Sequence, residues 1–302
     1  MKLNVKYRIT WAIYFFVALS LTACSFDKLF LVPTVSEPGA SNHSVISKNT
    51  GDTTFVTFDK DRNPIFLDDS GPTEFSFDLK NIQFESKSGN TLTSWLLLPK
   101  NDHNGITLVF FHGNAGNVLL QSQLAFPFVE RGYKILLVDY SGFGNSTGQA
   151  TRDNVLLDGY SAVEYALQSE ELKSEKLVIY GQSLGGHLAI PVALEYQDDI
   201  DGVVIEGAFS SHQDIAAKRA WILARIFVAE KYSAKKTIQK LHKPVLIIHS
   251  REDETIPFKM GEKLYEKANQ PKEFYPIDKC HICGPIYYAD SIDAKIKMIL
   301  QE

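Results

Sequence analysis

The strongest constraint on the fold is a repeated alternation of short apolar runs with longer amphipathic stretches, which begins near Phe75. The runs are mostly rich in Val, Ile, Leu and Phe and too short for helices, and from Ile106 onward each gap can hold one helix. Parallel strands buried on both faces have this pattern. The predicted strands are residues 82–85, 92–98, 106–111, 134–138, 176–180, 202–206, 245–249 and 274–277. The sequence therefore predicts an α/β fold with a mostly parallel central sheet of about eight strands and helices on both faces.

Two parts of this pattern predict antiparallel pairing instead. The first two runs are separated by a short polar segment that contains Lys87-Ser88-Gly89-Asn90, which favours a hairpin. Nearer the N-terminus, residues 55–58 and 65–67 predict a short strand pair that packs on the body of the protein.

Composition excludes several classes of protein. The chain has 302 residues, 44% of them hydrophobic, and a net charge of −5, so it is neither hydrophilic enough nor charged enough to be disordered. The mild acidity and the lack of a Lys/Arg cluster exclude nucleic acid as the main partner. Three cysteines are too few for a disulfide scaffold.

The N-terminus has the features of an export signal. Lys2, Lys6 and Arg8 precede fifteen uncharged, mostly apolar residues, 9–23, which is short of the ~20 residues that a membrane-spanning helix needs. Leu21-Thr22-Ala23-Cys24 resembles the lipobox of bacterial lipoproteins, in which the cysteine thiol is acylated after cleavage. The alternative is an uncleaved signal anchor with an incidental cysteine.

The lipobox resemblance implies an exported, lipid-anchored protein of the bacterial cell envelope. Residues 1–23 would be removed as the signal peptide, and Ser25 in second position resembles the sorting choice for the outer membrane, facing the periplasm. Cleavage removes three basic and no acidic residues, so the net charge would change from −5 to −8. Several acyl chains anchor a protein stably where one does not.

The next segment is predicted to connect the anchor to the body. Residues 33–54 are polar, rich in Ser, Thr, Pro, Gly and Asn, and without an apolar period, which predicts a flexible tether. We therefore divide the chain into the signal, a tether and N-terminal extension over residues 24–70, and a single domain over residues 71–302.

Gly181-Gln182-Ser183-Leu184-Gly185 matches the pattern G-x-S-x-G. The match gains weight from its position, because it follows the predicted strand 176–180 and opens a stretch, 184–196, that can form a helix. A nucleophile elbow has this strand-turn-helix setting, and the helix N-terminus favours negative charge on the serine. Ser183 is thus the predicted nucleophile; the alternative is a Gly-rich turn with a buried serine.

A serine nucleophile needs a base and an acid that orients it. With this elbow the order is Ser, then Asp or Glu, then His. The predicted strand 245–249 ends in a polar loop that contains Glu252, Asp253 and Glu254, at the edge where α/β sheets place their sites. His281 is the only histidine in the sequence downstream of this loop, so it is the predicted base. The loop offers three candidate acids.

From about Ile82 to its C-terminus the chain resembles the α/β-hydrolase superfamily, and within it the BEM46-like serine hydrolases. Their H-G-x-x-D-x-x-V/I-P pattern matches residues 249–257 with Ser250 in place of Gly, and it implies that Asp253 is the acid. Residues 111–117 resemble the family's HGNAGN loop, which implies that the backbone N–H of Asn114 or Ala115 is one oxyanion donor and that of Leu184 the other. Residues 139–148 resemble a Gly-rich turn of the family.

From the remaining histidines and carboxylates, the sequence predicts no metal and no cofactor. His112 is expected to organise its loop and His249 to pack at the end of its strand, and no histidine or carboxylate cluster has metal-ligand spacing. Cys280 and Cys283 flank the predicted base and leave three possibilities open: a disulfide that pins the loop, a redox pair, or two free thiols.

In this superfamily a cap lies between the strand 202–206 and Pro244. Residues 216–236 carry Trp221, Ile222, Arg225, Ile226 and Phe227 near helical spacing, so we expect a small helical cap over residues 208–243 whose apolar face covers the serine. A plain packing helix is the alternative.

Together these features predict a membrane-tethered serine hydrolase that cleaves carboxylic esters or thioesters, with a small molecule or acyl ester as substrate. A serine peptidase or amidase with the same three residues is the nearest alternative. A non-catalytic lipoprotein that uses the fold for binding is a third.

Overall fold

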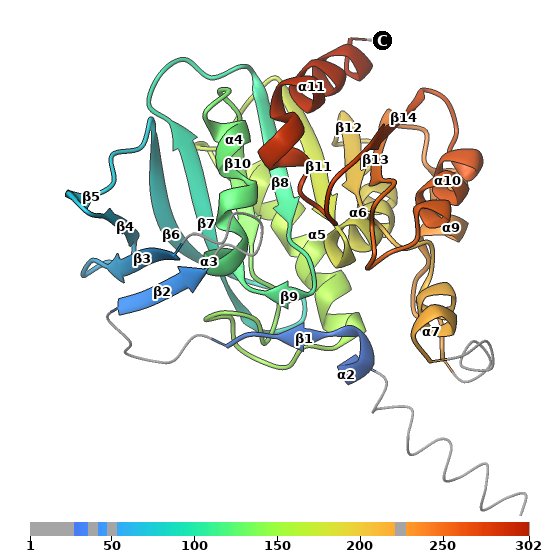
Figure 1. Cartoon of the computed structure of the whole chain (residues 1–302), viewed down its shortest axis with the longest axis horizontal. Helices are drawn as coiled ribbons and strands as arrows, with labels where there is room; N and C mark the ends of the chain where they lie inside the picture. Colours follow the sequence, from blue (N-terminus) through green and yellow to red (C-terminus); the bar gives the residue numbers. More distant parts are fainter. Residues whose placement is uncertain (1–26, 36–41, 47–52, 221–227, 302) are drawn as a thin grey trace, which may run out of the picture.

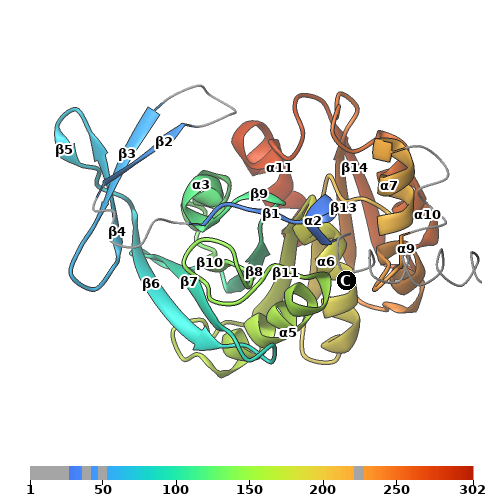
Figure 2. The same ribbon diagram turned by 90° about the horizontal axis from the view of Figure 1, so that it is seen from below.

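The computed structural model describes residues 27–35, 42–46, 53–220 and 228–301. A long sheet lies between two layers of helices (Figures 1 and 2). Its eight strands are β6 (Phe77–Glu85), β7 (Thr91–Pro99), β8 (Ile106–Phe111), β10 (Lys134–Val138), β11 (Lys176–Gln182), β12 (Gly202–Glu206), β13 (Val245–Ser250) and β14 (Lys272–Ile277). All eight predicted strands are therefore confirmed, several with ends shifted by a few residues.

The sheet has the order β14-β13-β12-β11-β8-β10-β7-β6. Neighbouring strands pair in parallel except around β7, which is antiparallel to both β6 and β10. The β6–β7 pair is the predicted hairpin. Every residue of β8, β12 and β13 is buried, which explains why these segments are continuous apolar runs. The parallel strands end at one edge, where the segments after β8, β11, β13 and β14 meet.

Each face of the sheet has its own helices and its own hydrophobic core (Figure 2). One core includes α5 (Arg152–Gln168), α6 (Leu184–Glu195) and α10 (Phe258–Lys267). The other includes α3 (Val118–Gln121), α4 (Phe126–Val129) and α11 (Gly284–Ile299). This arrangement confirms the predicted α/β fold with helices on both faces.

The segment predicted as a tether contains more structure than expected. α2 (Asp27–Phe30) and β1 (Val32–Pro33) lie against the body, and β1 pairs in parallel with β9 (Ala115–Gly116). β2 (Asn42–Ile46), β3 (Thr53–Phe58), β4 (Pro64–Asp68) and β5 (Gly71–Pro72) form a small antiparallel sheet. The prediction of one flexible tether over residues 33–54 is therefore wrong for Pro33 in β1, for β2 and for the start of β3, because backbone pairing between strands does not require an apolar period. The β3–β4 pair is the predicted short strand pair.

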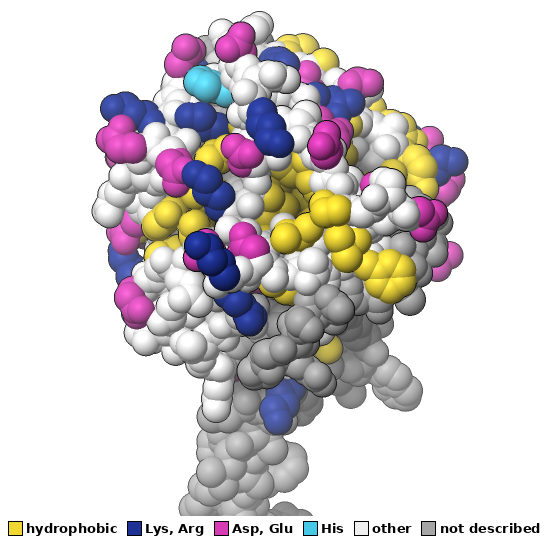
Figure 3. Space-filling view, turned by 90° about the vertical axis from the view of Figure 1, so that its left-hand side faces the viewer, with side chains coloured by type: hydrophobic (Ala, Val, Ile, Leu, Met, Phe, Trp, Pro, Cys, Tyr) yellow, Lys and Arg dark blue, Asp and Glu magenta, His cyan; other side chains and the backbone are white. Residues whose placement is uncertain are grey.

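The proposed signal peptide and Cys24 lie outside the described residues. Among the helices that the structure does describe, none is both long enough and apolar enough to cross a membrane. Figure 3 shows Lys/Arg and Asp/Glu side chains interspersed around apolar ones on the face at the left of Figure 1, without a field of one sign.

The predicted cap region contains α7 (His212–Ala220), α9 (Ala234–Thr237) and the short 3-10 helix η3 (Ile238–Lys240). A second 3-10 helix, η2 (Ser122–Leu124), lies outside this region and follows α3. Residues 221–227, which carry the predicted apolar face, lie outside the described residues. The described part of residues 208–243 lies beside α6 and α10 (Figure 1).

Candidate active site

Ser183 occupies a strained turn between β11 and α6. Its backbone has φ 55° and ψ −110°, a left-handed conformation that side-chain-bearing residues rarely adopt. The two glycines of the pattern are needed for close packing: a Cβ at Gly181 would collide with the Gly185 carbonyl, and one at Gly185 with the Phe111 carbonyl. The Ser183 N–H donates to the Glu206 carbonyl at 2.8 Å, and the side chain faces a cavity. This is the geometry of a nucleophile elbow.

The predicted acid and base are joined directly. His281, in the loop after β14, lies with its Nδ1 2.6 Å from Oδ2 of Asp253, in the loop after β13. With Nδ1 bound to the carboxylate, Nε2 is the ring nitrogen left to accept a proton. Of the other two candidate acids, Glu252 accepts a hydrogen bond from the Lys279 N–H, and Glu254 lines the cavity rim. Asp253 is thus the loop carboxylate that the structure brings to His281. His281 in turn lines the same cavity as Ser183.

The surroundings of Asp253 keep it ionised. Burial would raise its pKa, but hydrogen bonds from His249, His281 and the Ile256 N–H outweigh burial and lower the pKa below its usual range. Oδ1 accepts the N–H groups of Thr255 and Ile256 at 2.8 Å each. His249 Nε2 lies 3.4 Å from Oδ2. His249 does pack at its strand end as expected, but its contact with the carboxylate was not foreseen from the sequence.

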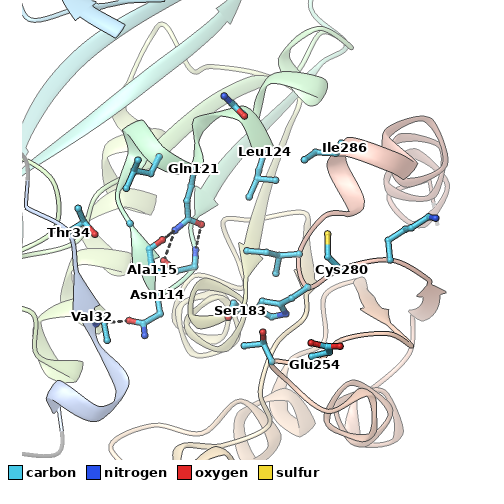
Figure 4. Close-up of a pocket in the computed structure, with 18 of the residues that line it drawn as sticks. Val32, Thr34, Asn114, Ala115, Gln121, Leu124, Ser183, Glu254, Cys280 and Ile286 are labelled. Carbon is cyan, nitrogen blue, oxygen red and sulfur yellow. Dashed lines mark hydrogen bonds between the residues drawn. The ribbon is translucent and has the colours of Figure 1, made fainter. Parts of the chain in front are cut away.

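The loop after β8 contains the predicted oxyanion donors, and Gln121 supports it from α3. Gln121 Oε1 accepts the Gly113 N–H at 3.0 Å, while Nε2 donates to the Gly113 and Ala115 carbonyls (Figure 4). On its other side, the Asn114 side chain accepts the Val32 N–H at 2.8 Å. The loop is therefore held from two sides, leaving the Asn114 and Ala115 backbone at the cavity wall.

His112 holds this loop through hydrogen bonds in the interior of the protein. It is fully buried, with Nε2 3.1 Å from Asp139 Oδ1 and Nδ1 2.7 Å from the Gly113 carbonyl. Asp139 also accepts the Val118 N–H, which fixes the start of α3. Burial raises the pKa of Asp139, although its hydrogen bond with His112 opposes the change. This geometry matches the expectation that His112 organises the loop and is not the base.

Glu206, at the end of β12, is a buried carboxyl that sequence reasoning missed. Oε2 accepts hydrogen bonds from Tyr180 Oη at 2.8 Å and Gln182 Nε2 at 2.7 Å, and Oε1 accepts the Gly284 N–H at 2.7 Å. Burial raises the pKa of Glu206, while these bonds lower it in part. Glu206 therefore links the residue before Ser183 to the first residue of α11, directly after the loop that carries His281.

The cavity that contains Ser183 and His281 has a volume of about 810 Å³. One part of its wall is apolar, with Leu120, Leu124, Ile282 and Ile286, and another carries Glu252, Glu254 and Lys279. Figure 4 shows Leu124 and Ile286 on one side of Ser183 and Glu254 on the other. Val32 and Thr34, from the N-terminal segment, complete the wall near Asn114. Among described residues, none from the predicted cap lines this cavity.

Cys280 and Cys283 face each other beside His281. Their Cα atoms are 5.7 Å apart and their sulfur atoms are adjacent, which suits a disulfide. The pair therefore has the geometry for the first of the three possibilities that the sequence leaves open.

One group among the described residues has the composition of a metal site, namely His187, His212 and Glu230. However, His212 Nδ1 already lies 3.1 Å from Glu230 Oε1 and 3.2 Å from the Tyr232 carbonyl, and His187 Nδ1 lies 2.9 Å from the Phe209 carbonyl. The hydrogen bond between His212 and Glu230 joins two of the three residues, and the ring of His187 contacts that of His212.

Known proteins are similar to this chain over two thirds of its length or more. Residues 102–236 match the family model described as serine aminopeptidase, S33. YfhR of Salmonella typhi, described as uncharacterized, is 31% identical over 67% of this chain and 73% of its own length. Protein bem46 of Schizosaccharomyces pombe is 30% identical over 69% of this chain and 72% of its own.

Solved structures agree with this relationship at the level of the fold. The esterase Pf2001 of Pyrococcus furiosus aligns with a TM-score of 0.62 and 18% identity, over 75% of this chain and 91% of that one. Est1E of Butyrivibrio proteoclasticus, solved with ferulic acid bound, aligns with a TM-score of 0.62 and 17% identity, over 73% and 100%. With the bem46 and YfhR similarity, these findings show that the chain belongs to the BEM46-like α/β hydrolases.

Proposed function

We propose that the protein is a membrane-tethered serine hydrolase that cleaves carboxylic esters or thioesters through an acyl-enzyme. The observation that carries the proposal is the 2.6 Å hydrogen bond between His281 and Asp253, with His281 lining the same cavity as a serine on a strained elbow. Family membership and the esterase neighbours support hydrolysis as the reaction class.

In the proposed reaction, His281 Nε2 removes the proton of Ser183 Oγ as the oxygen attacks the carbonyl carbon. The tetrahedral oxyanion accepts hydrogen bonds from the Leu184 N–H and from Asn114 or Ala115. When the carbon–oxygen or carbon–sulfur bond breaks, His281 returns the proton to the leaving group. Water, deprotonated by His281, then attacks the acyl-enzyme and releases the acid and free Ser183. Asp253 stabilises the imidazolium in both halves.

The cavity supports an acyl ester as substrate. Its apolar wall, with Leu120, Leu124 and Ile286, suits an acyl chain, and its charged rim suits a polar leaving group. A serine peptidase or amidase is the second candidate, since the matching family model carries that description.

An activated acyl ester and a peptide anilide with the same acyl group, assayed on one preparation, separate the two candidates. We expect kcat/KM for the ester to exceed that for the anilide by at least about 10³-fold, about 4 kcal/mol in the transition state. Comparable values for the two substrates would favour the peptidase.

The membrane anchor is a separate part of the proposal, supported by the lipobox at Cys24. Only Ser25 and Phe26 lie between Cys24 and Asp27, so at most about 10 Å of chain would separate a lipid from the folded body. We therefore propose that the enzyme lies close to the bilayer, in the outer membrane facing the periplasm. Incorporation of labelled palmitate, lost in Cys24→Ser, tests the anchor.

A further inference from the structure

Residues 27–35, which we call the N-terminal strap, are docked between the core and the loop after β8, residues 112–117, which we call the oxyanion loop. At the start of the strap, Asp27 Oδ1 accepts a 2.6 Å hydrogen bond from Nε of Arg152, whose side chain is buried. Phe30 and Leu31 are buried in the core, and the guanidinium of Arg152 lies 5.2 Å from the centre of the Phe30 ring. The first half of the strap is therefore clamped to α5 by an ion pair and by apolar burial.

The second half of the strap contacts the loop that carries the proposed oxyanion donors. The Val32 N–H donates to Asn114 Oδ1 at 2.8 Å, and Val32 and Pro33 pair in parallel with Ala115 and Gly116. Val32 and Thr34 also line the cavity (Figure 4). The strap thus meets the same loop as Gln121, from the opposite side.

The end of the strap is held by a third segment. The Thr34 carbonyl accepts the Gly144 N–H at 2.9 Å and Asn117 Nδ2 at 3.3 Å, and Val35 forms a bridge with Gly144. The Gly-rich turn after β10 therefore holds the end of the strap, which also contacts Asn117 in the loop after β8. Between Asp27 and Val35 the strap is attached at both ends, and its middle touches the oxyanion loop.

We propose that the N-terminal strap positions the oxyanion hole of the hydrolase, with the Val32 N–H as the positioning group. The inference rests on the proposed function. A loop carrying oxyanion donors must hold its N–H groups within a fraction of an ångström of their working positions. The bond from Val32 restricts Asn114, which lies between the Gly113 and Ala115 groups that Gln121 contacts, and the pairing with Ala115 adds to the bond that Gln121 makes there.

The test compares Val32→Pro, which removes the N–H, with Val32→Ala, which keeps the N–H and shortens the side chain. On a short-chain ester we expect kcat of Val32→Pro to be about 10- to 100-fold below that of Val32→Ala, with similar KM, because a transition-state interaction is lost. Affinity for an alkyl boronic acid, whose adduct occupies the oxyanion hole, should fall by a similar factor. Equal kcat and equal boronate affinity in the two variants would overturn the inference.

A second pair of variants covers the case in which Val32→Pro does not fold. Asp27→Asn weakens the clamp to Arg152, while Lys28→Gln changes an exposed neighbour. We expect Asp27→Asn to lower kcat and boronate affinity together by about 3- to 10-fold, relative to Lys28→Gln, at a temperature where both are folded. Identical values in the pair would contradict the inference. If the unaltered protein hydrolyses no ester, the proposed function itself fails; if it does and the variant pairs match, only the role of the strap fails.

Discussion

The two sides of the cavity are built in different ways. On one side, Ser183, Asp253 and His281 each follow a strand of the same sheet, and a side-chain hydrogen bond joins the last two. On the other side, the oxyanion loop is held through backbone groups by Gln121 and by the strap, which comes from the opposite end of the chain. The contrast teaches that the proposed chemistry depends on contacts between side chains, whereas the position of the oxyanion loop depends on contacts between side chains and backbone groups.

The largest effect on kcat is expected for the group formed by Ser183, Asp253 and His281. Asp253→Asn should lower kcat by about 10⁴-fold, because an amide neither stabilises the imidazolium nor holds the required tautomer. Steady-state kinetics on the ester measures the change. Glu254→Gln, in the same loop, is the matched control and should lie far closer to the unaltered enzyme. Losses of the same size in the two variants would remove the distinction between Asp253 and its neighbours.

A smaller effect on kcat is expected for the residues that hold the oxyanion loop. Gln121→Leu removes the acceptor for the Gly113 N–H and both donors to the loop carbonyls, and should lower kcat by about 10²-fold, comparable with loss of one oxyanion donor. Gln121→Glu keeps the acceptor and should fall between Gln121→Leu and the unaltered enzyme. A Gln121→Leu enzyme with full kcat would mean that the strap alone holds the loop.

The cysteine pair tests how firmly the His281 loop is fixed. If Cys280 and Cys283 are bonded, replacing both with Ser should lower the free energy of unfolding by about 2 kcal/mol, from loop-closure entropy alone. Thiol titration of the unfolded protein before and after reduction checks the bond directly, with two additional thiols expected after reduction. Two reactive thiols at these positions without reductant would exclude the disulfide.

A pH-dependent effect on stability is expected where the strap meets the core, where the Phe30 ring contacts His212 and His212 contacts His187. Burial, followed by the nearby His212, lowers the pKa of His187 from 6.5 to about 3. Between these values the unfolded chain binds more protons than the folded one. The free energy of unfolding should therefore fall as the pH drops below 6.5, by up to about 1.4 kcal/mol per pH unit from this residue.

Denaturant unfolding between pH 7 and 4.5 isolates this contribution. His187→Gln should show a shallower decline than the unaltered protein and than His242→Gln, a control substitution at an exposed position. Parallel curves for the unaltered protein and His187→Gln would show that His187 does not titrate on unfolding in this range.

The sequence predicts most of the sheet and the candidate nucleophile from local patterns, and the candidate base from the order of residues along the chain. β8, β10 and β12 are found at their observed bounds, since runs of five or six mostly apolar residues between polar segments are too short for helices. Ser183 and His281 follow from a motif and from chain order. Asp253 could not be chosen from the loop without the family pattern, because what distinguishes it is its two N–H donors, from Thr255 and Ile256.

The supporting residues were missed for a different reason. Glu206 contacts Gly284 across 78 positions, and Val32 contacts Asn114 across 82, so no local pattern connects them. The tether was predicted from polar composition, but backbone pairing of β1 with Ala115 and Gly116 requires no apolar side chain. Gln121 lies only eight positions from Gly113, yet a glutamine in a short helix carries no signal of a double hydrogen bond to a loop.

The central claim, that Ser183 is a nucleophile activated by its neighbours, is tested most directly by a fluorophosphonate probe. The account predicts that the folded protein is labelled stoichiometrically, that peptide mapping finds the label on Ser183, and that Ser183→Ala is unlabelled although its melting temperature is unchanged. No labelling of the folded protein, or labelling that persists in Ser183→Ala, would contradict it.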